Sequence, residues 1–325
     1  MRRLIPALAL LAACGTPPAD GTRETVVIPS GATFNEALDS LQAHGLIRNR
    51  FWPKLQARIA GTDRTIQAGT YRFQRGTPLH ELLRLLAEGD FRAMRFTVPE
   101  GLTVADLAAL AEERLGIPAD SVRAAARDSM LADSLGIGAP TFEGFLRPET
   151  YEFAPDATAR DLIIRMATEF LETWKPEWTA RLDTLDLTRR ELLALASIVE
   201  GEARVDEERE TIAGVYHNRL RIGMALQADP TVQYAIMLRT GERKKRLFEK
   251  DYEIDSPYNT YRHPGLPPGP VNSPSLRSIE AALYPAAVPY MFFVARPDGR
   301  HVFTRTYDEH LRAVAAARRA RDAGT

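Results

Sequence analysis

The chain of 325 residues contains a single cysteine, so no disulfide can form within it. It has no uninterrupted apolar run of 18 residues, and we therefore expect no transmembrane helix. Its 42 Lys and Arg are balanced by 43 Asp and Glu, which argues against a nucleic-acid-binding protein, because such proteins usually carry a basic surplus. The 45% hydrophobic content is that of an ordinary globular protein, long enough for two or three domains.

Metal-binding signatures are also missing from the sequence. No HExxH motif or comparable ligand spacing occurs among the six histidines. His217, which falls in a predicted helix, has no histidine four residues away on either side. A metalloenzyme built on His217, His263, His301 and His310 is therefore disfavoured, and no metal or cofactor is expected.

The N-terminus has the pattern of a bacterial targeting segment. Two arginines precede an apolar stretch, Leu4–Ala13, that is too short to span a bilayer. Cys14 follows directly, and the sequence LAAC resembles a lipobox, so we expect cleavage before Cys14, lipidation of its thiol and a lipid anchor in a membrane. A chance cysteine within a signal peptide is the alternative. Residues 1–13 are thus predicted to be a signal peptide and residues 14–25 a flexible tether.

The stretch that begins at Thr188 is the most informative part of the chain. Thr188 and Glu191 form the pattern of a capping box at the start of a helix. The helix continues through the apolar run Leu192–Val199 and ends in two acids, Glu200 and Glu202. Residues two apart on a helix point roughly 200° from each other, so one acid can face a pocket while the other faces solvent or a cation.

Glu202 has the surroundings expected of a general acid. Ala194, Leu195 and Ile198 share its side of the predicted helix. A carboxyl group in apolar surroundings is desolvated, which raises its pKa and lets it donate a proton near neutral pH. The alternative is an ordinary polar residue near the end of a helix.

Two further helices are predicted after this pair of acids. The first covers about residues 206–221 and stops at Gly223. Asp229 and Pro230 then suit the N-cap and the first position of the next helix. We prefer this interpretation of Asp229 to a catalytic role.

Several motifs in this region, in a fixed order, resemble the MltG (YceG-like) family of endolytic lytic transglycosylases. The main ones are ASIVEGE at 196–202, NRL at 218–220, LQADPTV at 226–232, YNTY at 258–261, GLPPGP at 265–270 and FVA at 293–295. The resemblance covers nearly all of the chain after the targeting segment. The family's catalytic acid is the second Glu of its Glu-x-Glu pair, which corresponds to Glu202. The middle residue, often Lys in the family, is Gly201 here.

The resemblance implies an α+β fold in which a LysM-like N-terminal region, residues 26–141, is followed by a mixed α+β catalytic domain, residues 142–325. A weak repeat agrees with LysM-like modules, because IPSGAT at 28–33 returns as VPEGLT at 98–103 and each copy leads into an amphipathic helix. A common turn before a helix is the alternative. Strand and helix patterns elsewhere include a hairpin across Gly299.

The resemblance also implies a location in the cell envelope. Members of the family usually have one N-terminal transmembrane helix, and this chain departs from that pattern with its lipobox. The resemblance to the family implies attachment to the inner membrane, whereas a lipid anchor at Cys14 is also compatible with attachment to the outer membrane. In both cases the enzyme faces the extracytoplasmic side. Proximity to peptidoglycan synthases is implied by the family alone.

The implied reaction is cleavage of the MurNAc–GlcNAc bond in nascent peptidoglycan strands, which gives 1,6-anhydro-MurNAc ends. Glu202 would serve as the single acid and base, without a cofactor. Side chains suited to positioning the sugars are Asn218, Gln227, Asp229, Tyr258, Asn259 and Thr260. Arg219 is expected to be either a charge partner or part of a structural ion pair with a helix acid.

Two other functions remain open from the sequence. One is a two-carboxylate muramidase that pairs Glu202 with Asp229 or Glu200 and leaves reducing-end sugars. The other is a non-catalytic, glycan-binding lipoprotein in which the LysM-like region carries the function.

Overall fold

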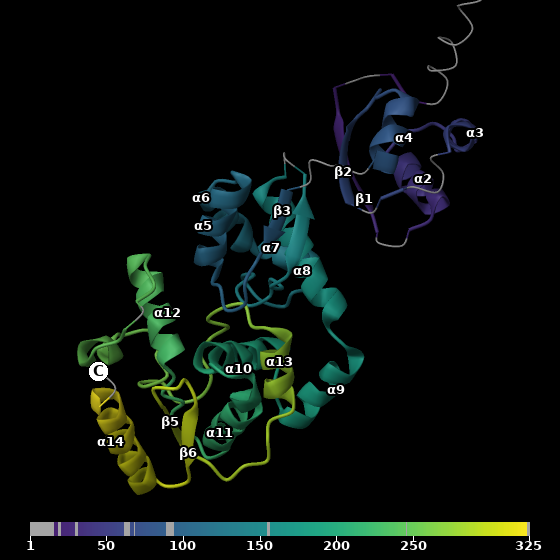
Figure 1. The fold of residues 1–325 in the computed structure, drawn as a ribbon. Coiled ribbons are helices and arrows are strands. Elements are labelled where there is room, and N and C mark those ends of the chain that lie inside the picture. The colour runs from purple at the N-terminus through teal and green to yellow at the C-terminus, as the bar shows by residue number, and fades with distance from the viewer. Residues whose placement is uncertain are drawn as a thin grey trace, which may run out of the picture. The chain divides into compact units, whose positions relative to one another are not determined.

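The computed structural model describes residues 16–18, 21–29, 32–61, 66–67, 69–88, 94–154, 157–244 and 246–323. It divides into two compact units (Figure 1). Unit 1 contains the chain up to Phe96 together with Tyr151–Ala157, and unit 2 contains Thr97–Thr150 and Thr158–Thr325. The predicted signal peptide and Cys14 lie outside the described residues. In the described part of the chain, no helix is both long and apolar enough to span a bilayer.

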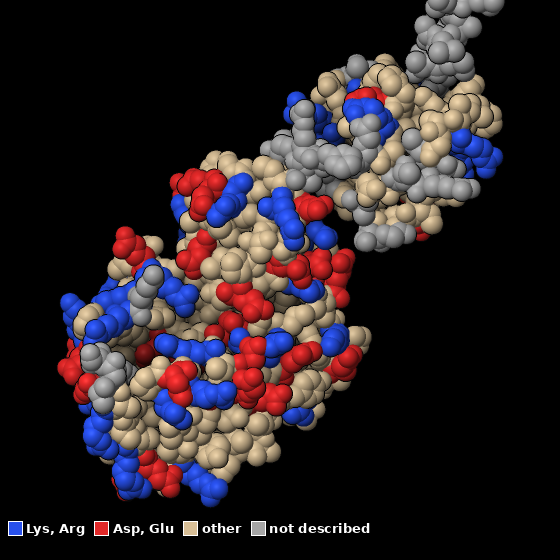
Figure 2. Space-filling model, viewed as in Figure 1, with Lys and Arg blue, Asp and Glu red and all other residues tan. Residues whose placement is uncertain are grey.

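The protein is a mixed α+β structure, as predicted, with many helices and small two-stranded sheets. Acidic and basic side chains are interspersed on the face shown in Figure 2, in keeping with the balanced charge. The start of the catalytic domain at residue 142 was predicted from the resemblance to the family, whereas the two units are divided by compactness. The division into units does not test that boundary, which stays a prediction.

Unit 1 is built around one antiparallel pair of strands. Its elements are β1 (Arg23–Ile28), α2 (Phe34–Ala43), α3 (Phe51–Ala60), β2 (Gly69–Gln74) and α4 (Leu79–Glu88). In the register, Val26 lies opposite Tyr71 and Ile28 opposite Gly69. The helices supply apolar residues to one core that includes Val26, Ile28, Leu38, Leu41, Tyr71, Phe73, Leu82 and Leu86.

A second pair of strands carries the chain between the units. These strands are β3 (Met94–Thr97) and β4 (Thr150–Phe153). Unit 2 continues with α5 (Val104–Leu115), α6 (Ala119–Ala126), α7 (Ser129–Ser134), α8 (Ala159–Thr173) and α9 (Pro176–Leu185). The sequence repeat has a structural counterpart, because α2 and α5 both start with a capping box, formed by Thr33 with Glu36 and by Thr103 with Asp106.

The rest of unit 2 surrounds α10 (Arg189–Glu202). Its elements are η1 (Asp206–Glu208), α11 (Arg209–Arg221), α12 (Asp229–Thr240), η2 (Glu249–Glu253), α13 (Leu276–Leu283), β5 (Phe292–Ala295), β6 (His301–Thr304) and α14 (Tyr307–Ala323). The predicted capping box of Thr188 and Glu191 starts α10. Every residue from Leu192 to Val199 is buried, and α10 packs against α11 and α13 (Figure 1). The predicted hairpin across Gly299 is confirmed by the antiparallel pairing of β5 and β6.

One side of α10 receives the segment that precedes α13. The hydroxyl of Ser197 accepts a hydrogen bond from the backbone N–H of Val271 at 3.0 Å, and the Asn272 amide donates to the Ser197 carbonyl at 2.9 Å. On the same side, a Cβ at Gly201 would stand 2.5 Å from Cγ of Pro230. Only glycine at position 201 therefore lets the first turn of α12 approach α10 this closely.

A buried carboxyl group joins α5 to α12. Glu143 accepts hydrogen bonds from the backbone N–H of Val104 at 3.1 Å and from the Tyr234 hydroxyl at 3.1 Å. Burial raises the pKa of Glu143 to about 8, against the opposing effect of these two hydrogen bonds. Glu143 is thus a neutral acid at pH 7, and it satisfies one free N–H at the start of α5.

This group predicts a pH-dependent stability. The unfolded Glu143 loses its proton near pH 4.5, whereas the folded one keeps it to about pH 8, so the stability that it supplies at low pH is lost as the pH rises through this interval. Glutamine stays neutral throughout. We expect the melting temperature of Glu143→Gln to rise relative to wild type between pH 5 and pH 8, by roughly 2–4 °C for each kcal/mol involved. Calorimetric scans across this range would measure it.

The matched control is Glu242→Gln, which changes an exposed acid in the same unit. Its melting temperature should follow the wild type at every pH. A constant offset between Glu143→Gln and wild type would show that Glu143 is ionised in the folded protein.

Candidate active site

Glu202 is the last residue of α10 and is half-buried. The hydroxyl of Tyr216, on α11, donates to its Oε1 at 3.3 Å. Burial and then the negative charge of Asp229 raise the pKa of Glu202 to about 7. The Tyr216 hydrogen bond, the backbone of Asp229 and the charge of Arg219 act in the opposite direction. Glu202 can therefore both hold and release a proton near neutral pH.

Glu200 has an entirely different set of partners. Its Oε2 accepts hydrogen bonds from the backbone N–H and hydroxyl of Ser275, at 3.0 and 2.5 Å, and from the hydroxyl of Ser278 at 2.8 Å. Arg209 completes the set with an ion pair of 3.2 Å. The two acids thus point to different surroundings, as their spacing on the helix predicts. Glu200 ties α10 to α11 and α13, which leaves Glu202 as the acid at the site.

The predicted N-cap role of Asp229 is wrong. Ala228 occupies the N-cap, and Asp229 is the first residue of α12 and does not cap it with its side chain. Instead, Oδ1 of Asp229 accepts hydrogen bonds from the hydroxyls of Tyr261 at 2.7 Å and Tyr252 at 3.2 Å. The two rings lie 4.5 Å apart between centroids. Asp229 is therefore turned toward a pair of tyrosines, and its charge acts on Glu202.

Both tyrosines are held as hydrogen-bond donors. Burial, followed by the charge of Asp229, raises the pKa of Tyr252 to about 12, and the same causes raise the pKa of Tyr261. Each hydroxyl stays protonated at physiological pH and continues to stabilise the carboxylate.

Arg219 supplies a buried positive charge on α11. Its Nε donates to the carbonyl of Met291 at 2.8 Å and its Nη1 to the carbonyl of Leu226 at 2.5 Å. Within the described chain it forms no ion pair with a carboxylate, so of the two roles expected of Arg219 the ion pair with a helix acid is not found. Its charge instead lowers the pKa of Glu202 across the site, so it favours the carboxylate form.

Two of the residues expected to bind sugar are fully buried. The Asn259 amide donates to the carbonyls of Tyr252 and Ile254, both at 2.9 Å. The Thr260 hydroxyl accepts from the backbone N–H of Ala228 at 3.0 Å. This differs from the predicted role, because neither side chain has surface left for a ligand. They hold the tyrosines and the start of α12 in place.

The remaining predicted sugar contacts are Asn218, Tyr258 and Gln227. The Asn218 amide donates to the carbonyls of Val288 and Tyr290, at 2.8 and 2.9 Å, so it too fixes a loop. Tyr258 is half-buried against the ring of Tyr234, at 4.9 Å. Gln227 is exposed and has a left-handed backbone with φ of 50°, which is uncommon for a residue other than glycine. Strain of this kind gathers at functional sites, which keeps Gln227 a candidate for contact with sugar.

Sequence reasoning missed Tyr216 and Tyr252 as parts of the site. For Tyr216 a signal existed, since it lies three residues before Arg219 and so shares its helix face. Nothing local marks Tyr252, because its contact with Asp229 bridges 23 residues. Among the described residues, no group of three or more His, Cys, Asp or Glu could hold a metal ion.

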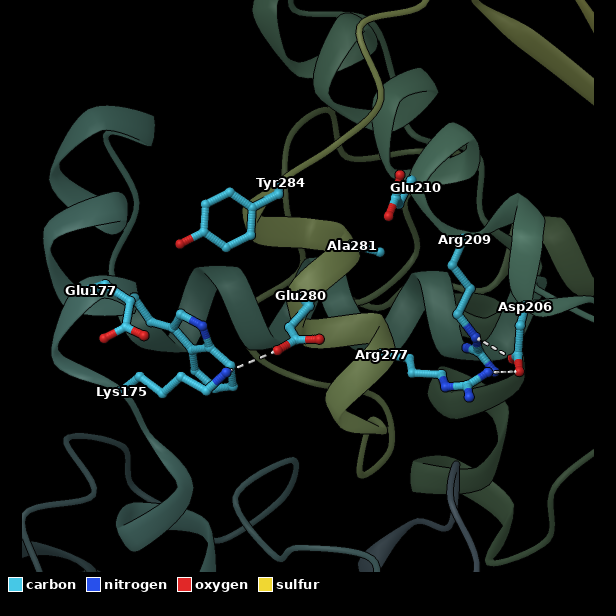
Figure 3. Close-up of a pocket in the computed structure, with 10 residues that line it drawn as sticks. Lys175, Glu177, Asp206, Arg209, Glu210, Arg277, Glu280, Ala281 and Tyr284 are labelled. Atoms are coloured by element: carbon cyan, nitrogen blue, oxygen red, sulfur yellow. Dashed lines mark hydrogen bonds and ion pairs between the residues drawn. The ribbon is translucent and has the colours of Figure 1, made fainter.

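A separate cavity of about 430 Å³ lies between α9, α13 and the start of α11 (Figure 3). Five of its charged side chains are paired with one another. Lys175 contacts Glu280 at 3.2 Å, and Asp206 binds both Arg277 and, at 3.0 Å, Arg209. Glu202 does not line it. The paired charges indicate a structural junction rather than a second catalytic centre.

The comparisons with known proteins identify the family of this chain. A family model described as YceG-like matches residues 26–316. A protein of Bacillus subtilis strain 168 named endolytic murein transglycosylase is 33% identical, with 90% of this chain and 84% of that protein covered. A Streptococcus pneumoniae D39 protein of the same name is 30% identical, and the match covers 90% of this chain but 58% of that longer protein.

A solved structure is similar as well. A crystal structure of a YceG-like protein from Listeria monocytogenes matches with a TM-score of 0.60 and 30% identity, covering 90% of this chain and 99% of that one. The resemblance inferred from the motifs around Glu202 is thereby confirmed. Because the family match spans most of the sequence, this chain belongs to the YceG-like family.

Proposed function

We propose that this protein is an endolytic murein transglycosylase that cuts the MurNAc–GlcNAc bond within peptidoglycan strands. The observation that carries the proposal is Glu202, a carboxyl whose pKa is raised to about 7 by burial and by the charge of Asp229. Curated relatives with the same activity in their names support the substrate class. Glu200 is occupied by four donors, which leaves one acid for the chemistry.

The reaction needs only one proton-transfer group. Neutral Glu202 donates its proton to the glycosidic oxygen, the bond to C1 of N-acetylmuramic acid breaks, and positive charge develops at C1. The resulting Glu202 carboxylate takes the proton of the C6 hydroxyl of the same sugar, whose oxygen then bonds to C1. The product is a 1,6-anhydro ring, no water is consumed, and Glu202 is protonated again. The nucleophile is intramolecular, so proximity replaces an activated water.

The neighbours of Glu202 suit both halves of this cycle. The Tyr216 hydroxyl and the buried charge of Arg219 stabilise the carboxylate that exists after the first proton transfer. The charge of Asp229 and burial favour the protonated acid that starts the cycle. Gln227, which is exposed and precedes Asp229 by two residues, is our candidate to contact the sugar.

A two-carboxylate muramidase remains the second candidate, and one observation favours it. Asp229 is close enough to Glu202 to raise its pKa, as a second carboxylate would be. Against it, Asp229 is engaged by two tyrosine hydroxyls. A non-catalytic glycan-binding lipoprotein does not explain why Glu202 is tuned to a pKa of about 7.

The placement of the enzyme in the cell is part of the same proposal. The sequence LAAC at Cys14 supports a lipid anchor, with the protein facing the extracytoplasmic side of the inner membrane or of the outer membrane. Residues 26–141 would form LysM-like modules near the glycan, supported by the repeated turn and capping box at Thr33 and Thr103. Peptidoglycan synthases are the proposed partners, since the substrate is the nascent strand.

One prediction of this proposal concerns the products of the reaction. Glu202→Gln should lower the rate of strand cleavage by about 10²–10⁴-fold, because glutamine cannot transfer the proton. Digests of purified peptidoglycan, analysed by mass spectrometry, should contain anhydro ends one water lighter than hydrolysis products for the wild type only. The matched control is Glu253→Gln, an exposed acid that should leave the rate unchanged. Hydrated products from the wild type would instead support the muramidase.

Another prediction of this proposal concerns the pH dependence of the rate. Since Glu202 must start protonated, kcat/KM should fall as the pH rises above about 7. Asp229→Asn removes the charge that raises this pKa, so the descending limb should move to lower pH and activity at pH 7 should drop. Asparagine keeps an oxygen for the tyrosine hydroxyls. A pH–rate profile with an unmoved limb would rule out the electrostatic role of Asp229.

A further inference from the structure

A cavity of about 550 Å³ lies at the start of α10, and we name it the Arg190 pocket. Its apolar walls come from Leu187, from Leu220 at the end of α11, and from the segment Leu266–Pro268. The charged side chains at its surface are Arg190 and Glu191. The pocket therefore combines an apolar lining with one cation and one anion.

The two charges are not equivalent. The Glu191 carboxylate is committed to the capping box, where it accepts from the Thr188 backbone N–H at 2.8 Å and from its hydroxyl at 2.7 Å. The half-buried Arg190 has no such partner, because no carboxylate lies within 4 Å of it and no hydrogen bond engages it in the described chain. This contrasts with the cavity in Figure 3, where Lys175 and Arg277 are paired.

The surroundings leave room for the guanidinium group. A Cβ at Gly269 would stand 3.3 Å from Nε of Arg190 and 3.6 Å from the Tyr258 hydroxyl. Any larger residue at 269 would crowd Arg190 against the wall. A planar guanidinium beside apolar walls is suited to a ligand that presents a carboxylate next to small apolar groups.

The pocket continues the elements that build the active site. Leu220 follows Arg219 directly, and Leu266–Pro268 follows Tyr261 by a few residues. Tyr258, beside Arg190, packs in the same cluster as Tyr261. Along α10, Arg190 precedes Glu202 by 12 residues, which corresponds to a rise of about 18 Å. A glycan strand that occupies both Glu202 and the pocket must therefore cover roughly this distance.

We propose that the Arg190 pocket binds a peptide stem of the glycan strand, with Arg190 holding a stem carboxylate and the apolar walls holding its small side chains. This inference rests on the proposed function, because it names a feature of that substrate. The stem in question belongs to a muramic acid several sugars from the bond that Glu202 cleaves. The pocket would thus make the enzyme prefer strands that still carry their peptides.

The test compares two substrates, namely glycan strands with peptide stems and the same strands after an amidase has removed the stems. Arg190→Gln in the full chain should lower kcat/KM on the stem-bearing strands by about tenfold or more, because a charge-assisted bond is lost. Its activity on the bare strands should stay at the wild-type level. Arg190→Lys keeps the positive charge but loses the planar guanidinium group, so its kcat/KM on stem-bearing strands should lie between those of the wild type and Arg190→Gln.

The matched control is Arg239→Gln, which removes an exposed arginine of α12 away from the pocket and should change neither substrate. Equal losses of Arg190→Gln on both substrates, or no loss on either, would overturn the proposal. Binding gives a readout that does not need catalysis. In the Glu202→Gln background, Arg190→Gln should weaken the binding of stem-bearing strands alone.

The products and the binding data separate a failure of the proposed function from a failure of this inference. A wild-type protein that makes no anhydro ends from either substrate would refute the transglycosylase. In that case a loss of stem-dependent binding in Arg190→Gln would still uphold the pocket, and unchanged binding would refute it.

Discussion

The structure of the site depends on one carboxyl group, that of Glu202, held between a negative and a positive side chain in a largely desolvated place. Neither neighbour could be buried alone, since an unpaired charge in a protein interior is costly. The protein satisfies Asp229 with two tyrosine hydroxyls and Arg219 with two backbone carbonyls. Within the described chain neither ion pairs with the other or with Glu202, and their charges have opposite effects on the pKa of Glu202.

The second acid of the pair makes this arrangement possible. Glu200 anchors the end of α10 through Arg209 and two serines, so the helix cannot turn to expose Glu202 differently. Gly201 stands between the two acids and leaves room for Pro230, the neighbour of Asp229. A side chain at position 201 would push the start of α12 outward. The glycine thus brings the Asp229 charge close to Glu202.

Local signals in the sequence predicted the elements well. The capping box at Thr188 and the turn at Gly299 depend on residues a few positions apart, and both are present. The desolvation of Glu202 was predicted from the apolar residues on its own helix, and burial is the main cause of its raised pKa. Asp229 was misassigned because its partners, Tyr252 and Tyr261, are 23 and 32 residues away. An aspartate before a proline has the local pattern of an N-cap, and only the distant tyrosine donors show that its carboxylate is used elsewhere.

Burial explains the other difference from the sequence. Amide and hydroxyl groups suit sugars and also suit the inside of a loop, so their chemistry alone could not separate the two uses for Asn259 and Thr260.

Residue types alone also could not separate the two possible reactions. A muramidase needs a second carboxylate free to act on water or on C1, while Asp229 already accepts two hydrogen bonds from tyrosines. A single group that must be acid first and base second needs a pKa near the working pH, which opposing charges around Glu202 provide and a fixed ion pair would not.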